Sequence, residues 1–302
     1  MNRNSFAVNG RQRAARLAML LVIVVAVAMA LIAQMPGKAA APKRAKLPKS
    51  VRLYVFDCGR LKVEDPVRFN FKKEELSVLD LSAPCFLIAH PKGTLMWDVG
   101  VVPDSAFKAA GGPATKEYAT ATKPLLPQLA AAGYTPADIT YLVLSHVHWD
   151  HVANVSLFAN STWLVRKVER DAMFADTLPP RTDRSMFEAM RNTKTVIITS
   201  DDYDVFGDGT VVIKSTPGHT PGHQSLFVKL ARTGPVVLAG DLYHYPEELK
   251  AKRVPAGDFD KQQTLASRAA LEAFLKQSGS QLWIQHDLAK ISKLKKAPEF
   301  YD

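Results

Sequence analysis

Residues 145–151 constrain this chain more than any other segment of its 302 residues. They read Ser-His-Val-His-Trp-Asp-His, which puts three imidazoles and one carboxylate into six positions of a chain with only eight histidines. The segment follows an apolar run over residues 141–145 that predicts a strand. In extended backbone, side chains two residues apart point the same way, so His146 and His148 can reach one ion. The turn beyond brings Asp150 and His151 to a neighbouring position, and the segment therefore predicts two adjacent metal sites.

Three more candidate ligands each follow a predicted strand. Taken singly, each would be an ordinary polar residue at a strand end. Taken together with the histidine-rich segment, His219 can complete the first site, His286 can complete the second, and the carboxylate of Asp241 can bridge two cations. Neutral imidazole and carboxylate suit two Zn²⁺ or other divalent first-row ions. The predicted ligands are His146, His148, Asp150, His151, His219, Asp241 and His286.

The first fifty residues predict an export segment rather than part of the fold. Four arginines precede an uninterrupted apolar run over residues 17–33. The run is longer than the hydrophobic core of an ordinary signal peptide and close to the length that spans a bilayer. A signal peptide cleaved near the small residues 39–41 and an uncleaved membrane anchor both remain open. We therefore expect residues 1–50 to be a signal or anchor with a basic linker, and residues 51–302 to be a domain outside the cytoplasmic membrane.

The formal charge of +10 points to nucleic acid only at first sight. Residues 1–50 hold nine Lys or Arg and no acidic residue, so residues 51–302 carry 30 basic and 29 acidic side chains. A nearly neutral body gives no basis for phosphate-backbone binding. We expect no nucleic-acid partner, and membrane contact only through the N-terminal segment.

The chain has two cysteines, Cys58 and Cys85. An exported protein meets conditions in which one disulfide can form. Cys85, however, begins an apolar run over residues 85–88 that predicts a buried strand, where free cysteine is common packing material. Packing without a disulfide is the favoured interpretation, and the bridge remains the alternative.

Short strands grouped in pairs dominate the domain, with helical windows between them. Spacing of apolar residues predicts helices over residues 115–132 and through residues 265–275. Strands in meanders with helices packed outside predict an α/β fold with two mixed sheets face to face, an αββα sandwich. The predicted strands cover residues 52–56, 86–89, 94–97, 141–145, 162–165, 196–199, 211–214, 224–230, 236–239 and 281–285.

The histidine-rich segment SHVHWDH resembles the HxHxDH signature of the metallo-β-lactamase superfamily. The segment TPGHTPGHQSL at 216–226, and the ending QHD followed by PEFYD, resemble its N-acyl homoserine lactonases. The resemblance implies an αββα fold, a dinuclear zinc site and hydrolysis of an ester bond, in which a hydroxide bridging two metals opens a small-molecule lactone. Another hydrolase of the fold, acting on a β-lactam or thioester, and a non-catalytic metal-binding protein are the alternatives.

One departure affects the catalytic residues. Lactonases of this type often have a tyrosine three residues after the bridging aspartate, and here that position is His244, flanked by Tyr243 and Tyr245. We expect one of these three to act on the substrate carbonyl or leaving group, and Asp150 to pass a proton.

Other residues are expected near the centre or away from it. We expect His223 to support the ligands and His90 to lie in a solvent-facing turn. Asp98 is expected either to support the ligands or only to hold its own loop in place. The apolar residues that could form a wall over the metals, or simply pack between helices, are Phe107, Tyr118, Met173, Phe174, Met186 and Phe187.

Overall fold

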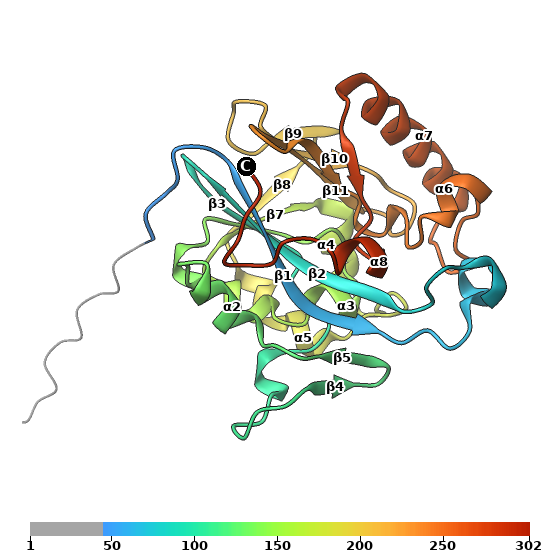
Figure 1. The fold of residues 1–302 in the computed structure, drawn as a ribbon, viewed down its shortest axis with the longest axis horizontal. Coiled ribbons are helices and arrows are strands. Elements are labelled where there is room, and N and C mark those ends of the chain that lie inside the picture. The colour runs from blue at the N-terminus through green and yellow to red at the C-terminus, as the bar shows by residue number, and fades with distance from the viewer. Residues whose placement is uncertain (1–44) are drawn as a thin grey trace, which may run out of the picture. The chain divides into compact units, whose positions relative to one another are not determined.

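The computed structural model describes residues 45–302, and the predicted export segment lies almost entirely outside them. Two β-sheets pack face to face, with helices on their outer sides (Figure 1). The larger sheet has eight strands in the order β4-β5-β1-β2-β3-β6-β7-β8, and the smaller has five in the order β13-β12-β11-β10-β9. The predicted αββα sandwich is confirmed.

The larger sheet is mixed, because β3, β6, β7 and β8 are parallel and the other pairs are antiparallel. Its strands are β1 (Arg52–Leu61), β2 (Leu81–His90), β3 (Gly93–Trp97), β4 (Ala114–Lys116), β5 (Ala119–Ala121), β6 (Tyr141–Val143), β7 (Thr162–Arg166) and β8 (Thr195–Ile198). The strands of the smaller sheet are β9 (Asp202–Asp204), β10 (Val211–Ser215), β11 (Gln224–Leu230), β12 (Gly234–Leu238) and β13 (Gln281–Trp283).

The helices lie mostly in the connections between strands. They are α2 (Leu125–Ala131), α3 (Trp149–Val152), α4 (Lys167–Met173), α5 (Arg184–Phe187), α6 (Glu247–Ala251), α7 (Lys261–Ser278) and α8 (Leu288–Ile291). Short 3₁₀ turns include η1 (Pro66–Phe69), η3 (Asp104–Ala106) and η7 (Gly240–Leu242). Within residues 45–302, no helix is both long and apolar enough to cross a membrane.

The period of two along the strands explains how the layers are built. In β1, Leu53 and Val55 face the smaller sheet, while Tyr54 and Phe56 belong to the apolar cluster on the other side. A strand buried on both faces must be apolar at successive positions. The outer face of the smaller sheet is covered by α7, whose Leu271 packs in a third cluster with residues of β11 and β12.

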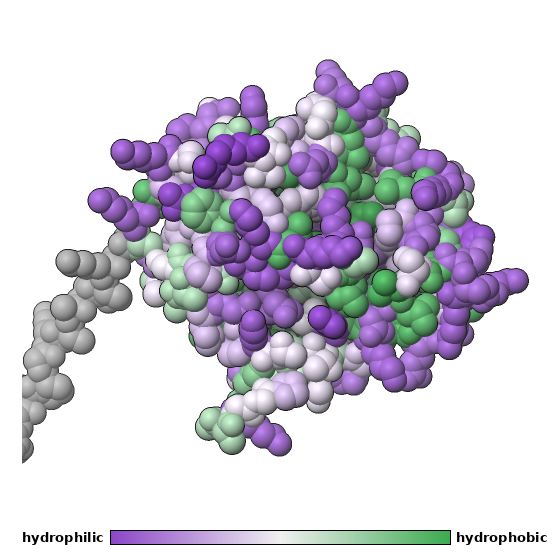
Figure 2. Space-filling view, viewed as in Figure 1, coloured by the Kyte–Doolittle hydropathy of each residue, from purple (hydrophilic) through white to green (hydrophobic). Residues whose placement is uncertain are grey.

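The surface is more polar than these three clusters. Hydrophilic residues cover most of the face in Figure 2, and hydrophobic ones show between α7 and α8. Among residues 45–302, the most exposed large apolar side chains are those of Phe259 at 65% and Val67 at 62% exposure.

The helix predicted over residues 115–132 is wrong in its first half. That half forms the hairpin of β4 and β5, and Glu117 takes a φ of 51° at its turn. The helical half, α2, begins after Pro124, where the carboxylate of Asp104 accepts the backbone N–H groups of Leu125 and Leu126. A carboxylate from a distant loop thus starts the helix, which apolar spacing cannot reveal.

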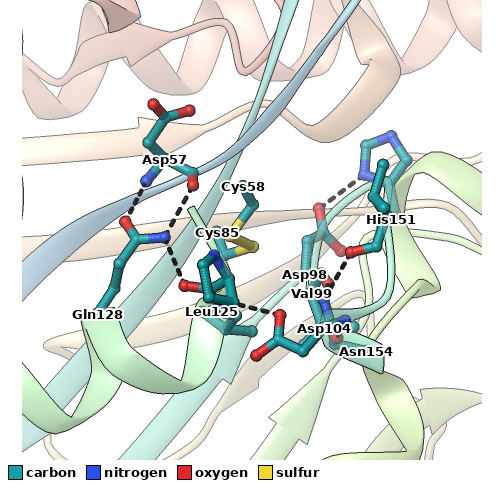
Figure 3. Close-up of a disulfide and its surroundings, with 12 residues drawn as sticks. Asp57, Cys58, Cys85, Asp98, Val99, Asp104, Leu125, Gln128, His151 and Asn154 are labelled. Atoms are coloured by element: carbon teal, nitrogen blue, oxygen red, sulfur yellow. Dashed lines mark hydrogen bonds and ion pairs between the residues drawn. A yellow bond between two sulfur atoms is a disulfide. The ribbon is translucent and has the colours of Figure 1, made fainter. Parts of the chain in front are cut away.

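The preference for free cysteines is also wrong. Cys58 and Cys85 form a disulfide, with their Cα atoms 5.8 Å apart. The antiparallel pairing of β1 and β2 brings them together, since Phe56 is opposite Cys85 in the register. Figure 3 shows the disulfide between the Asp57–Gln128 hydrogen bonds and the loop that carries Asp98.

The prediction that His90 faces solvent is wrong. Its side chain is buried, stacks on Phe206 at 4.0 Å between ring centroids, and places Nε2 3.0 Å from Asp208 Oδ2. The turn at Gly207 folds back over the end of β2 and buries the imidazole.

Candidate metal centre

The seven predicted ligands converge at one edge of the sandwich. His146 and His148 lie in the loop after β6, and Asp150 and His151 lie in the short helix α3 that follows. His219 lies between β10 and β11, Asp241 in η7 after β12, and His286 after β13. Each of the seven is at most 5% exposed. Four separate strand ends therefore supply one buried polar cluster.

The ligands form two groups that share one carboxylate. His146, His148, His219 and Asp241 make the first group, and Asp150, His151, His286 and Asp241 make the second. Within each group, the candidate ligand atoms all lie within 4.8 Å of one another. This is the division that the sequence predicts.

Asp241 has one oxygen for each group. Its Oδ2 lies 3.3 Å from His219 Nε2 and 3.7 Å from His146 Nε2. Its Oδ1 lies 3.1 Å from His151 Nε2 and 3.0 Å from His286 Nε2. A carboxylate held between two sets of imidazole nitrogens in this way can bridge two cations.

Several polar atoms of the cluster have no hydrogen-bond partner although they are buried. They include both carboxylate oxygens of Asp241, Nε2 of His151 and Nε2 of His286. Buried polar groups without partners are costly, so such a set needs a ligand to satisfy it. Converging imidazole and carboxylate donors fit divalent first-row cations such as zinc.

Three acceptors outside the cluster fix the orientation of the imidazoles. Nδ1 of His151 lies 2.9 Å from Asp98 Oδ2, and Nδ1 of His219 lies 2.9 Å from Asp258 Oδ1. Nδ1 of His286 lies 2.6 Å from the carbonyl oxygen of Ser82. Each acceptor holds the proton on Nδ1 and leaves the Nε2 lone pair for a metal ion. Of the two alternatives for Asp98, support of a ligand is therefore the one that the structure shows (Figure 3).

His223 is also a supporting residue rather than a ligand. Its Nδ1 donates to the carbonyl oxygen of Thr216, and its Nε2 accepts the backbone N–H of Asp241. Burial lowers the pKa of His223 to about 3, which keeps the ring neutral and able to accept. His223 therefore fixes the turn that presents Asp241.

Glu169 supports two ligand loops and is not among the residues predicted from the sequence. This buried residue of α4 accepts the backbone N–H of Val147 through Oε1 and that of Gly222 through Oε2. Oε1 also accepts the hydroxyl of Thr220. Burial raises the pKa of the Glu169 carboxyl. No local motif marks the residue, because its partners come from loops before β7 and after β10.

The pKa values of the ligand groups follow their burial and their neighbours. Burial lowers the pKa of His146 and of His148 well below the ordinary value, which favours neutral imidazoles. Burial raises the pKa of Asp150, but His151 and then Arg181 outweigh it, so the net shift is downward. Neutral His146 and His148 and an ionised Asp150 are the forms that bind metal. Burial opposes protonation of His151, but the carboxylates of Asp241 and Asp98 raise its pKa, and a bound cation would have to displace that proton.

Of Tyr243, His244 and Tyr245, only His244 faces the centre. Its Nε2 lies 3.2 Å from Asp241 Oδ2, and both ring nitrogens are buried without a hydrogen-bond partner. Burial opposes protonation of His244, but the nearby Asp241 carboxylate raises its pKa to about 9. The Tyr243 hydroxyl donates to Glu272, and the Tyr245 hydroxyl donates to the carbonyl oxygen of Leu79.

The predicted wall residues separate into two kinds. Met173, Met186 and Phe187 are buried in the apolar cluster outside the larger sheet, and Phe107 and Phe174 pack against it. Tyr118, 37% exposed at the turn between β4 and β5, packs edge-on against Trp149 with 5.4 Å between ring centroids. Tyr118 therefore contacts a residue that lies between two predicted ligands in the sequence.

Comparison with known proteins agrees with this geometry. A family model for the metallo-beta-lactamase superfamily matches residues 79–279. The chain belongs to this superfamily. The matched residues include six of the seven predicted ligands, and only His286 lies beyond them.

Similar members of the superfamily are N-acyl homoserine lactonases. AttM of Azorhizobium caulinodans is 30% identical over 266 residues, which cover 83% of this chain and 99% of AttM. AiiA of Bacillus thuringiensis subsp. kurstaki is 28% identical over 257 residues, which cover 82% of this chain and 98% of AiiA. A solved structure of an N-acyl homoserine lactone hydrolase has the product N-hexanoyl-L-homoserine bound at its catalytic metal center. It matches this structure with a TM-score of 0.67 at 26% sequence identity, and the match covers 85% of this chain and 99% of that one.

Proposed function

We propose that the protein is a dinuclear-metal hydrolase that opens the lactone ring of N-acyl homoserine lactones. The observation that carries the proposal is the convergence of seven buried ligands into two groups joined by Asp241. The likeness to N-acyl homoserine lactonases over nearly their whole length supports the substrate class. We propose zinc as the metal, because histidines predominate among the ligands.

Residues of the chain handle the proton transfer and the positioning of the substrate. When bound, two divalent cations supply Lewis acidity that polarises the ester carbonyl and makes water nucleophilic near neutral pH. Oδ1 of Asp150 is buried without a hydrogen-bond partner and can accept the proton that the attacking water loses. Water oxygen bonds to the carbonyl carbon, the ring C–O bond breaks, and Asp150 returns the proton to the leaving alkoxide. The product is a hydroxy acid.

His244 takes the position beside the bridging aspartate in this proposal. Its Nε2 can donate a hydrogen bond to the carbonyl oxygen or to the departing alkoxide. The hydroxyls of Tyr243 and Tyr245 are already bonded elsewhere, which supports His244 over both.

The activity is tested with the purified full-length chain loaded with zinc. Proton release is recorded with a short-chain and a long-chain acyl homoserine lactone, an aliphatic lactone, a cephalosporin and a thioester. Opening of the lactones in preference to the cephalosporin and thioester is expected. His148→Ala should abolish turnover and reduce bound zinc, whereas His90→Gln, a change at a buried histidine outside the centre, should leave both intact. Preferred cleavage of the cephalosporin or thioester would overturn the lactone proposal.

We also propose that the protein is exported, with the domain outside the cytoplasmic membrane. The arginines and apolar run over residues 1–33 support export. The Cys58–Cys85 disulfide supports it independently, because structural disulfides persist in oxidising compartments. Fractionation of cells that produce the full chain, with N-terminal sequencing of the product, tests the proposal and separates cleavage from anchoring. Recovery of the intact chain in the cytoplasm with both thiols reduced would contradict it.

A further inference from the structure

Arg181 is a cation at the metal centre that neither the ligand set nor the proposed mechanism uses. Its guanidinium Nη2 lies 4.0 Å from Asp150 Oδ1. Within residues 45–302, Asp150 is the acidic residue that the guanidinium approaches to ion-pair distance. The side chain is 31% exposed, whereas that of Asp150 is 1% exposed. Arg181 therefore lies between the buried centre and solvent.

One hydrogen-bonding atom of Arg181 and one of Asp150 are unsatisfied. The distance of 4.0 Å is too long for a hydrogen bond. Nε of Arg181 and Oδ1 of Asp150 are buried, and neither has a hydrogen-bond partner. Guanidinium presents planar, fixed donors that match the oxygens of carbonyl and carboxylate groups. An acceptor supplied from outside the chain can satisfy Arg181.

The backbone around Arg181 holds it in place. Its φ of 61° lies in the left-handed region, which a non-glycine residue rarely adopts. Its carbonyl oxygen accepts the backbone N–H of Trp149, the residue between His148 and Asp150. Two residues on, Asp183 forms an ion pair with Lys116 of β4 at 2.8 Å. The segment is thereby tied both to the ligand loop and to the hairpin that carries Tyr118.

We propose that Arg181 is a specificity-determining residue whose guanidinium donates hydrogen bonds to the amide carbonyl oxygen of an N-acylated lactone. The inference rests on the proposed function. An amide oxygen next to the scissile ring can reach a donor beside Asp150 when the ester lies at the metal centre. Lactones that lack the amide offer Arg181 no such acceptor. The site should therefore prefer N-acylated lactones over alkyl lactones of equal size.

The test compares two substrates that differ in the amide. N-hexanoyl homoserine lactone and an α-alkyl-γ-butyrolactone of matched length are assayed with full-length, zinc-loaded wild type, Arg181→Met, Arg181→Lys and the control Arg191→Met. Methionine and lysine have a Cβ like arginine, so both variants keep the same strained φ at position 181. Arg191, the control position, is an exposed arginine paired with Glu188. Bound zinc and the melting temperature are measured for each variant.

Arg181→Met should lower kcat/KM for the N-acylated lactone about 10- to 100-fold, mainly through KM, as expected for loss of a hydrogen bond from a charged donor. Turnover of the alkyl lactone should stay within about threefold. For Arg181→Lys, kcat/KM for the N-acylated lactone should lie between the values of wild type and Arg181→Met. Arg191→Met should match wild type on both substrates. Equal losses on both substrates, with or without loss of zinc, would show that Arg181 only positions Asp150 and would overturn the inference. Unchanged kinetics would also overturn it. Failure of the wild type to open either lactone would refute the proposed function itself.

Discussion

At the scale of single residues, the ligands depend on partners that hold their loops. Glu169 is the clearest case, because one carboxylate joins the loop of His146 and His148 to the loop of His219. Both of its oxygens accept hydrogen bonds in a buried position, where an unmade bond is costly. Its role is to position the ligands.

Replacing Glu169 should therefore weaken metal binding. Glu169→Gln retains one acceptor oxygen, but its amide NH₂ faces a backbone donor, and we expect about 10- to 100-fold weaker zinc binding, as for other residues that orient ligands. Zinc affinity is measured by competition with a chelator. Glu188→Gln, at an exposed glutamate, is the control. Unchanged affinity in Glu169→Gln would contradict the positioning role.

His244 gives a second prediction at this scale. His244→Phe keeps an aromatic ring beside Phe69 but removes the donor near Asp241, and we expect kcat to fall about 100-fold with zinc content unchanged. His244→Tyr restores a donor and should recover part of the loss. Steady-state kinetics on an acyl homoserine lactone provide the measurement. If phenylalanine and histidine give equal kcat values, His244 has no part in the reaction.

At the scale of elements, close packing between loops and helices sets where the ligands lie. Gly218 precedes His219 and has a φ of 135°, and a Cβ there would lie 2.3 Å from the backbone nitrogen of Thr264 in α7. No side chain fits without moving the loop or the helix.

Gly218→Ala should therefore displace His219 and disturb the first metal group. We expect zinc content to fall by about one ion per chain, since one ligand of that group leaves its place. Metal analysis of the dialysed protein is the measurement. Gly209→Ala is the matched control, because Gly209 also has a positive φ of 72° but has open space around its Cβ position. Full zinc content in Gly218→Ala would show that the loop adapts.

The pairing of β1 and β2 also carries a prediction. The Cys58–Cys85 disulfide closes a separation of 27 residues, and its removal should lower the free energy of unfolding by about 3–4 kcal/mol. The double variant Cys58→Ala/Cys85→Ala is compared with wild type by urea unfolding at a fixed zinc concentration. A loss of less than about 1 kcal/mol would mean that strand pairing alone keeps these segments together in the unfolded chain.

At the scale of the whole molecule, the centre joins both sheets. His146, His148 and the α3 ligands follow a strand of the larger sheet, while His219, Asp241 and His286 follow strands of the smaller one. Bound metal ions should therefore hold the sheets together as well as support catalysis.

Metal removal should consequently lower the stability of the entire domain. Zinc at about 1,000 times its dissociation constant adds about 4 kcal/mol to folding, so a chelated sample should melt at a distinctly lower temperature. Calorimetry with stepwise addition of zinc should show recovery, and magnesium should restore little because imidazole suits zinc better. His148→Ala should show a smaller zinc response. Equal melting temperatures with and without metal would contradict the structural role.

The sequence alone predicted which seven side chains come together and how they divide into two groups, because each belongs to a loop or short helix that follows a strand with a recognisable local period. It also determined the two-sheet architecture, since strands buried on both faces need partners on both sides. Tertiary structure decided the matters that depend on distant segments: the pairing of Cys58 with Cys85, the turning of Tyr243 and Tyr245 away from the centre, and the placement of Glu169 and Arg181 beside it. Strand order and loop packing bring such residues together. The spacing of apolar residues within a short segment predicts neither the strand order nor the loop packing.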